Sequence, residues 1–147
     1  MHSSSIALIV GGSSGMGLST AKQLIAKGIS IVILGNKSTK LATAKSDLEA
    51  LSKDGATIET LQANLYQQQD IDKVIQNINT ESRHIQYLVN AAGYFSPKPF
   101  LSHEAKDYDT YASLNRATFF ISQAVVNNMI KYGGGAIVHI GSMWAKQ

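Results

Sequence analysis

The chain has 147 residues, of which 44% are hydrophobic and 16% are charged, a composition that is ordinary for one globular domain. The absence of cysteine excludes disulfide bonds and thiolate-bound metals, and no hydrophobic run approaches the ~20 residues of a membrane span. The net charge of +3 comes with scattered lysines, which suits a small anionic ligand better than nucleic acid. We therefore expect one cytoplasmic domain over residues 1–147, without a signal peptide, that binds no metal, nucleic acid or membrane.

The first element is an unbroken apolar run, residues 6–10, which predicts a strand buried on both faces. A stretch rich in glycine and serine follows, and then a helix pattern with Ala21, Leu24 and Ile25 on one face and Gly28 at its end. A strand, a glycine turn and a helix together place free backbone N–H groups at a helix N-terminus. Such groups, with the helix dipole, are suited to binding a pyrophosphate.

The spacing of the glycines in this turn is informative. Gly11, Gly15 and Gly17 fit G-x-x-x-G-x-G and not the commoner dinucleotide pattern G-x-G-x-x-G. A triphosphate-binding P-loop is excluded because Leu18 stands where that loop needs lysine. Taken alone, the spacing also fits an ordinary glycine-rich turn between a strand and a helix.

Further strands and helices alternate along the rest of the chain. The apolar runs predict four more strands, at residues 30–34, 57–61, 84–90 and 136–140. Two helical stripes, which we assign to the core, are formed by Leu41, Ala44, Leu48 and Leu51 and by Ile71, Val74, Ile75 and Ile78. One long helical region covers residues 102–132. Glycines follow the first of these stripes and the long region, and this alternation is typical of an α/β fold with a parallel sheet.

Residues 7–18 resemble the cofactor loop of the short-chain dehydrogenase/reductase family, non-extended type, although Val10 replaces a usual threonine and Gly12 a frequent alanine. Asn90-Ala91-Ala92-Gly93 resembles the motif that ends the family's fourth strand. Asn115 lies within the long helix, as the family's catalytic asparagine does.

Residues 137–142 resemble the family's fifth strand and its catalytic serine, which would be Ser142. The resemblance covers the whole chain, which stops at Gln147, before the place of the family's Tyr-x-x-x-Lys motif. The implied fold is a doubly wound, Rossmann-like parallel sheet of about five strands in the order 3-2-1-4-5, with helices on both faces and a C-terminally incomplete domain. The fifth strand would then be an apolar sheet edge, and such edges pair with other chains. We expect a homo-oligomer formed through this strand and the helix of residues 102–132.

The resemblance also implies hydride transfer between a nicotinamide cofactor and an alcohol or carbonyl substrate, in which Ser142 holds the substrate oxygen. It implies that Asn115 distorts its helix and holds a water that leads to the catalytic lysine. Because the chain lacks the catalytic tyrosine and lysine, we expect Asn115 only to lock two elements together. The expected function is the N-terminal part of an NADP(H)-dependent oxidoreductase, inactive by itself. The alternatives are a nucleotide-binding module without catalysis and a self-associating structural protein.

The cofactor-binding residues that the resemblance implies follow four successive strands. They are Gly11, Ser13, Ser14, Gly15, Met16 and Gly17, then Asn36 and Lys37, then Asn64 and Leu65, and then Asn90, Ala91 and Gly93. Asn64 stands where the family's aspartate contacts the adenine amino group. Residues 90–93 have a partly structural role in the family, and we expect this structural role to outweigh their contribution to cofactor binding.

The end of the second strand decides between the two nicotinamide cofactors, because a carboxylate there binds the ribose hydroxyls and repels a 2′-phosphate. The resemblance implies that NAD-preferring members of the family have aspartate at the position of Gly35. Lys37 and Lys40 lie close to this position in the sequence. This favours NADP and leaves NAD possible. The alternative is that both lysines are only solvated, which is the better interpretation for Lys40.

Two further patterns are given no chemistry. Tyr94 and Lys98 have the Tyr-x-x-x-Lys spacing, but Pro97 and Pro99 make the helix that this motif needs improbable. His139 lies in an apolar strand, and we interpret it as a core histidine whose hydrogen bonds are satisfied.

Overall fold

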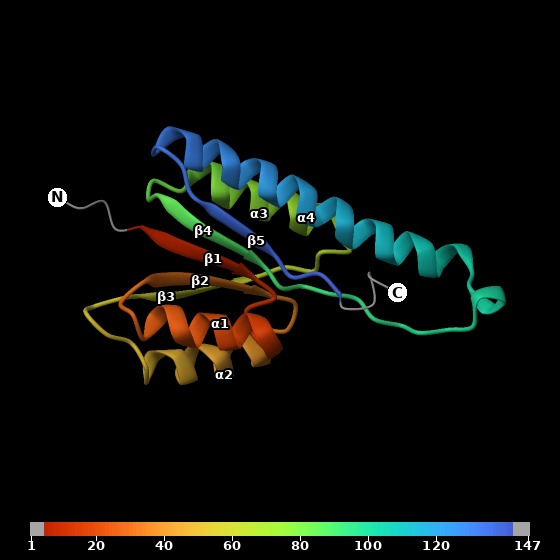
Figure 1. Cartoon of the computed structure of the whole chain (residues 1–147), viewed down its shortest axis with the longest axis horizontal. Helices are drawn as coiled ribbons and strands as arrows, with labels where there is room; N and C mark the ends of the chain where they lie inside the picture. Colours follow the sequence, from red (N-terminus) through yellow and green to blue (C-terminus); the bar gives the residue numbers. More distant parts are fainter. Residues whose placement is uncertain (1–4, 143–147) are drawn as a thin grey trace.

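Five parallel strands form one sheet in the order β3-β2-β1-β4-β5 in the computed structural model, which describes residues 5–142 (Figure 1). The strands are β1 (Ile6–Val10), β2 (Ser30–Gly35), β3 (Ile58–Gln62), β4 (Ile85–Asn90) and β5 (Ala136–His139). The predicted strand order is confirmed, and each boundary lies within one residue of its predicted position.

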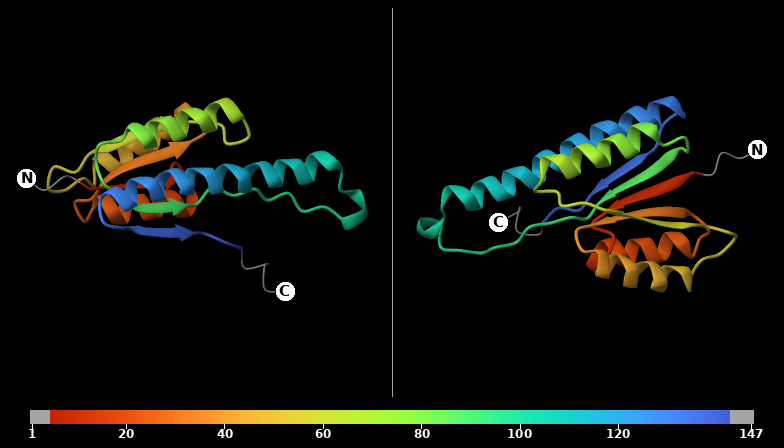
Figure 2. Two further views of the ribbon diagram at one scale, coloured as in Figure 1. Left: turned by 90° about the horizontal axis from the view of Figure 1, so that it is seen from above. Right: turned by 180° about the vertical axis from the view of Figure 1, so that it is seen from behind.

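Helices cover both faces of this sheet. Helices α1 (Gly15–Ile25) and α2 (Ser38–Glu49) lie on one face, and α3 (Gln68–Thr80) and α4 (Ala105–Lys131) lie on the other (Figures 1 and 2). The 3-10 helix η1 (Phe100–Ser102) precedes α4. The change of face follows from right-handed crossovers, because the chain moves outward from β1 to β3 and then returns to place β4 on the other side of β1. Within residues 5–142, no helix is long and apolar enough to cross a membrane.

Strand β1 lies at the centre of the hydrophobic core, and all five of its residues are buried. Ala7 and Ile9 face α1 and α2, whereas Leu8 and Val10 belong to the cluster under α3 and α4. This explains why the sequence of β1 shows no polar alternation: a strand covered on both faces has no solvent side.

Two predicted core positions are wrong. Leu51 is 41% exposed because α2 ends at Glu49, so that the apolar stripe of this helix stops at Leu48. His139 is exposed because, within residues 5–142, β5 pairs with β4 alone and forms the edge of the sheet, where Val138 is 54% exposed as well. The prediction that the fifth strand is an edge is confirmed.

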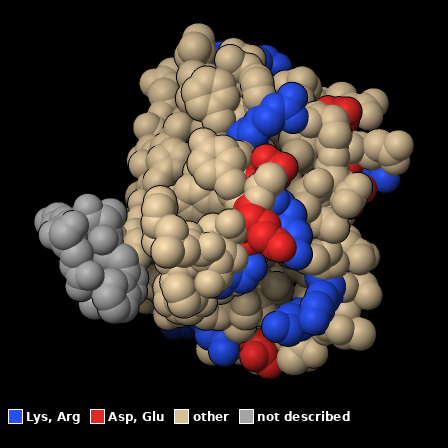
Figure 3. Space-filling view, turned by 90° about the vertical axis from the view of Figure 1, so that its right-hand side faces the viewer, with Lys and Arg blue, Asp and Glu red and all other residues tan. Residues whose placement is uncertain are grey.

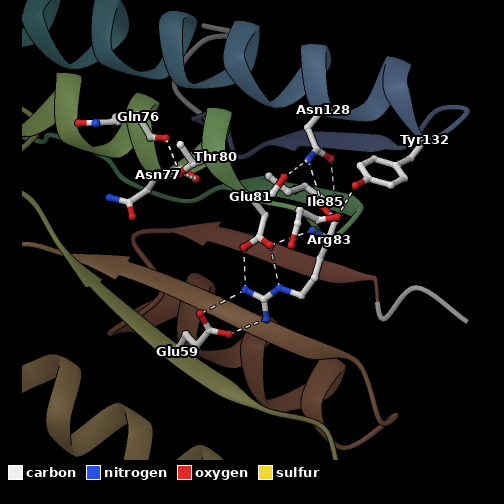
Figure 4. Close-up of polar contacts among 10 residues, drawn as sticks. Glu59, Gln76, Asn77, Thr80, Glu81, Arg83, Ile85, Asn128 and Tyr132 are labelled. Atoms are coloured by element: carbon white, nitrogen blue, oxygen red, sulfur yellow. Dashed lines mark hydrogen bonds and ion pairs between the residues drawn. The ribbon is translucent and has the colours of Figure 1, made fainter. Parts of the chain in front are cut away.

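A buried asparagine joins α4 to the start of β4 (Figure 4). Asn128 Oδ1 accepts a hydrogen bond from the Ile85 N–H at 2.8 Å, and its Nδ2 donates to the Arg83 carbonyl at 3.0 Å. Nδ2 also lies 3.4 Å from the Glu81 carbonyl oxygen. One side chain therefore satisfies backbone groups that have no partner in the strand ladder.

Arg83 connects two carboxylates at the same end of the sheet (Figure 4). Its Nη1 lies 2.6 Å from Glu59 Oε1 on β3, and its Nη2 lies 2.6 Å from Glu81 Oε2. The hydrogen bonds from Arg83 hold the pKa of Glu81 below its usual value, although partial burial opposes this shift. Glu81 therefore stays ionised at neutral pH, and the cluster ties β3 to the segment that leads into β4.

We expect Asn128→Ala to lower the free energy of unfolding by about 2–4 kcal/mol, because it leaves the buried Ile85 N–H and the partly buried Arg83 C=O without this partner. The matched control is Asn127→Ala, at an exposed position of the same helix, which should change stability by less than about 0.5 kcal/mol. Urea unfolding followed by circular dichroism measures both. Equal stability of the two variants would contradict the role given to Asn128.

Candidate functional site

A cleft of about 470 Å³ lies at the carboxyl ends of the central strands. Its walls come from the turn after β1, from the segments that follow β2, β3 and β4, and from Leu114 of α4. Figure 3 shows the face of the molecule at which these strands end, with basic side chains bordering a hollow. The carboxyl edge of an open parallel sheet is the usual place for a ligand in α/β proteins.

The cleft brings together most of the cofactor-binding residues predicted from the sequence. These are Gly11, Ser13, Ser14, Gly15, Met16, Asn36, Lys37, Asn64, Leu65, Ala91 and Gly93. The other two, Gly17 and Asn90, are buried and do not line it. Lys40 lines the cleft as well, although solvation was the preferred interpretation for this residue.

Gly17 sets how closely α1 approaches the turn after β1. A Cβ atom at Gly17 would lie 2.1 Å from the Gly11 carbonyl oxygen, and one at Gly11 would lie 2.7 Å from the Ala92 nitrogen. No side chain can replace either hydrogen without moving the backbone. The result is that the first turn of α1 starts directly at the floor of the cleft.

The N-terminus of α1 offers unpaired backbone donors at this floor. Ser14 is the N-cap residue, but its side chain makes no capping hydrogen bond, and the first turn contains no acidic residue. Gly15 has a φ of +54°, which favours glycine. A Cβ atom at this position would meet no atom within 4 Å. Uncapped N–H groups and the helix dipole favour an anion at this place.

The end of β2 gives the cleft a positive charge. Lys37 and Lys40 line it, and no carboxylate does so among the residues that the structure describes. Lys37 is the N-cap residue of α2 and Lys40 lies in its first turn, and this helix also begins without a side-chain cap or an acid in that turn. At Gly35 a Cβ atom would lie 2.8 Å from Ser13 Oγ, so an aspartate there would require Ser13 to move.

Beyond β3, Asn64 organises a turn. Its Oδ1 accepts a hydrogen bond from the Tyr66 N–H at 3.1 Å, and its own N–H donates to Asp70 Oδ2 at 2.9 Å. This second hydrogen bond, together with one from Lys73, lowers the pKa of Asp70. Asn64 Oδ1, which takes the place of the family's aspartate beside the adenine amino group, therefore already accepts one hydrogen bond within the turn.

Tyr66 is a cleft residue that the sequence analysis did not identify. It lines the cleft with its side chain 40% exposed, and its ring contacts the Tyr94 ring edge-on. Partial burial raises the pKa of its hydroxyl. No motif marks this position, and the only available signal was its place two residues after Asn64.

Asn90 lies behind the cleft and has a structural role. It is 4% exposed, and its Nδ2 donates to Ser122 Oγ at 3.2 Å and lies 3.0 Å from His139 Nδ1. These contacts join β4 to α4 and β5. Its Oδ1 is buried without a hydrogen-bond partner in the described part of the chain.

The two predicted catalytic residues lie outside the cleft. Asn115 is exposed on α4, and its side chain forms no hydrogen bond within residues 5–142; Asn128 of the same helix is the asparagine that joins two elements. Its neighbours on the helix stripe, Tyr111 and Phe119, are also exposed. Ser142 is exposed just beyond β5, as the last residue that the structure describes.

The Tyr94–Lys98 pair does not form a catalytic motif. Residues 91–99 adopt no helix, as the two prolines indicated. Lys98 Nζ lies 2.7 Å from both carboxylate oxygens of Asp107, and this pairing raises the pKa of Lys98 and lowers that of Asp107. Across the described residues, no group of three or more His, Asp or Glu side chains could hold a metal ion.

Known proteins share both the sequence and the fold of this chain. A family model described as short chain dehydrogenase matches residues 5–147. Gluconate 5-dehydrogenase of Gluconobacter oxydans is 34% identical over 138 residues, which are 93% of this chain and 53% of that protein. A 2-dehydro-3-deoxy-D-gluconate 5-dehydrogenase of Formosa agariphila is 29% identical, over 96% of this chain and 53% of that protein.

Two solved structures agree with the fold at high similarity. A short-chain dehydrogenase from Sphingobium yanoikuyae in complex with NADPH has a TM-score of 0.85 and 30% identity, over 95% of this chain and 54% of that one. L-sorbose reductase from Gluconobacter frateurii, complexed with NADPH and L-sorbose, has a TM-score of 0.87 and 27% identity, over 97% of this chain and 54% of that one. The chain thus spans about half the length of the relatives it matches. From the family match over residues 5–147 and the shared sheet order, we conclude that this chain belongs to the short-chain dehydrogenase family.

Proposed function

We propose that residues 1–147 are the cofactor-binding part of an NADP(H)-dependent oxidoreductase that transfers hydride between nicotinamide and an alcohol or carbonyl compound. The observation that carries this proposal is the cleft at the carboxyl edge of the sheet. It combines an uncapped helix N-terminus with Lys37 and Lys40, and no carboxylate lines it among the described residues. Relatives with this fold bind NADPH, which supports the same cofactor here.

The residues of the cleft fit the parts of such a cofactor. The α1 N-terminus, with residues 11–16, would hold the pyrophosphate, and Lys37 with the start of α2 would hold the 2′-phosphate. The segments after β3 and β4 would border the adenosine and the nicotinamide side. The bound nicotinamide would supply or accept the hydride, while this chain would bind and orient the cofactor.

We further propose that residues 1–147 do not complete a catalytic turnover by themselves. The reaction needs a proton donor or acceptor beside the substrate oxygen. The one tyrosine with a lysine four residues later is Tyr94, and its lysine is paired with Asp107 in an extended segment. The chain is therefore expected to bind NADPH without oxidising it when alcohol or carbonyl substrates are added.

We expect Lys37→Ala to weaken NADPH binding roughly fivefold to tenfold, because it removes about 1 kcal/mol of attraction to the 2′-phosphate. NADH lacks this phosphate, so its affinity should change less than about twofold, and the loss for NADPH should shrink at high salt. Isothermal titration of both cofactors measures this difference.

Lys53→Ala is the matched control for this experiment. Lys53 is exposed in the connection between α2 and β3 and does not line the cleft, so its removal should leave both affinities unchanged. Tighter binding of NADH than of NADPH by the unaltered chain would contradict the proposed cofactor preference.

Self-association is a second candidate function, which exposed apolar side chains on neighbouring elements favour. Val138 on β5 is 54% exposed, and on α4 Phe119 is 64% and Ile130 72% exposed. An unpaired strand edge with apolar side chains favours pairing with another chain. We propose that the 147-residue chain forms homo-oligomers through β5 and α4.

We expect light scattering to show a dimer or a larger species at micromolar concentration, and Val138→Lys to shift it toward the monomer. A lysine on an edge strand opposes pairing because its charge would have to be desolvated. Gln69→Lys, at an exposed position of α3, is the control and should leave the assembly unchanged. A monomer over the whole concentration range would contradict the self-association.

A further inference from the structure

Tyr66 presents an aromatic ring to the cleft. Tyr66 lines the cleft, is 40% exposed, and contacts Tyr94 with ring centroids 6.5 Å apart and planes at 75°. This edge-to-face contact is a preferred geometry for two aromatic rings. Tyr94 in turn packs against the core cluster under α3 and α4, so the Tyr66 ring is held by the body of the protein.

The backbone that carries Tyr66 is also fixed. Asn64 Oδ1 accepts the Tyr66 N–H, the Asn64 carbonyl accepts the Gln67 N–H at 2.9 Å, and Asp70 Oδ2 accepts the Asn64 N–H. Asp70 belongs to the first turn of α3, so this turn is anchored to a helix. The ring is therefore preorganised before any ligand binds, which lowers the ordering cost of binding.

The same contacts change the role of Asn64. Its side-chain oxygen already accepts the Tyr66 N–H, so a base that used this oxygen would have to share it with the turn. Beside it, Leu65 and Leu114 are buried apolar residues of the cleft wall. This wall therefore offers apolar and aromatic surface to the face of a purine, whereas the Asn64 oxygen near the purine edge already has one donor.

We propose that Tyr66 is the base-binding residue of the cleft, with the purine of the dinucleotide packed against its ring. This inference rests on the proposed function and names how the adenine end is recognised. Stacking on an aromatic ring does not depend on which purine is present, because every base has a π-face. The site should therefore tolerate a change at the purine edge and should be sensitive to loss of the Tyr66 ring.

The first test compares NADPH with its analogue in which hypoxanthine replaces adenine, by isothermal titration of the 147-residue chain. The analogue replaces the amino group with a carbonyl oxygen and keeps the ring, so its affinity should lie within about threefold of that of NADPH. If the Asn64 oxygen instead recognised the adenine amino group, the loss of affinity would be much larger, because the carbonyl oxygen of hypoxanthine would face the Asn64 oxygen and both are acceptors. A loss of more than about tenfold for the analogue would overturn the proposal.

The second test compares Tyr66→Leu with Tyr66→Phe. Phenylalanine keeps the ring and should bind NADPH within about twofold of the original chain, whereas leucine should weaken binding about tenfold. Thermal unfolding of both variants identifies those that remain folded, and Tyr94→Leu provides a second variant that should weaken binding by freeing the Tyr66 ring.

The outcomes separate this inference from the proposed function. NADPH binding that is tight in the original chain and unchanged in a folded Tyr66→Leu variant contradicts the inference alone. Absence of binding for both NADPH and its hypoxanthine analogue contradicts the proposed function and the inference together.

Discussion

The close approach of α1 to the turn after β1 is the constraint on which the cleft depends. A Cβ atom at Gly17 would lie 2.1 Å from the Gly11 carbonyl oxygen, and Gly11 itself leaves no room for a Cβ atom beside Ala92. These two glycines let the helix, β1 and the end of β4 meet in one place. Because they meet, the N-terminus of α1 opens directly into the cleft, and the segments after β2 and β3 complete its walls.

The positive charge of the cleft comes from the N-termini of α1 and α2 and from two lysines. The helices α1 and α2 both begin there without side-chain caps or acids in their first turns, and α2 carries Lys37 as its N-cap residue and Lys40 in its first turn. An anionic ligand therefore meets donors and positive charge from two elements. The Arg83 cluster and Asn128 lie at the other end of the sheet, where they hold β3, β4 and α4 together. Binding and structural stabilisation are thus placed at opposite ends of the strands.

Much of this arrangement could be predicted from the sequence, because it is local. The apolar run of β1, the glycine turn, the segment after β3 and the end of β4 are each continuous in the chain, and the resemblance supplied the strand order. The positions that were misjudged depend on distant partners or on edges. The sequence predicts His139 as a core residue because it does not show that β5 lies at the edge of the sheet. Leu51 continues the apolar spacing of α2, but this helix ends at Glu49.

Asn128 and Tyr66 show the same limit at the level of single side chains. Asn128 continues the buried stripe of α4, whereas Asn127 lies off it, but the sequence does not show that its partners are backbone groups more than forty positions away. Tyr66 gains its place through a turn that Asn64 forms and through the ring of Tyr94. A sequence pattern records periodicity and motif spacing, but it does not record which polar groups are left to be satisfied once the elements have packed.

The measurement that most directly tests the central claim is a titration of the isotope-labelled chain with NADPH, followed by the chemical shifts of its backbone amides. The account predicts saturable shifts that are largest in residues 11–17, 36–40, 64–66 and 91–93, while the amides of residues 81–85 and Asn128 stay in place. Saturable shifts confined to other surfaces, or no shifts at NADPH concentrations in the millimolar range, would contradict the assignment of this cleft to the cofactor.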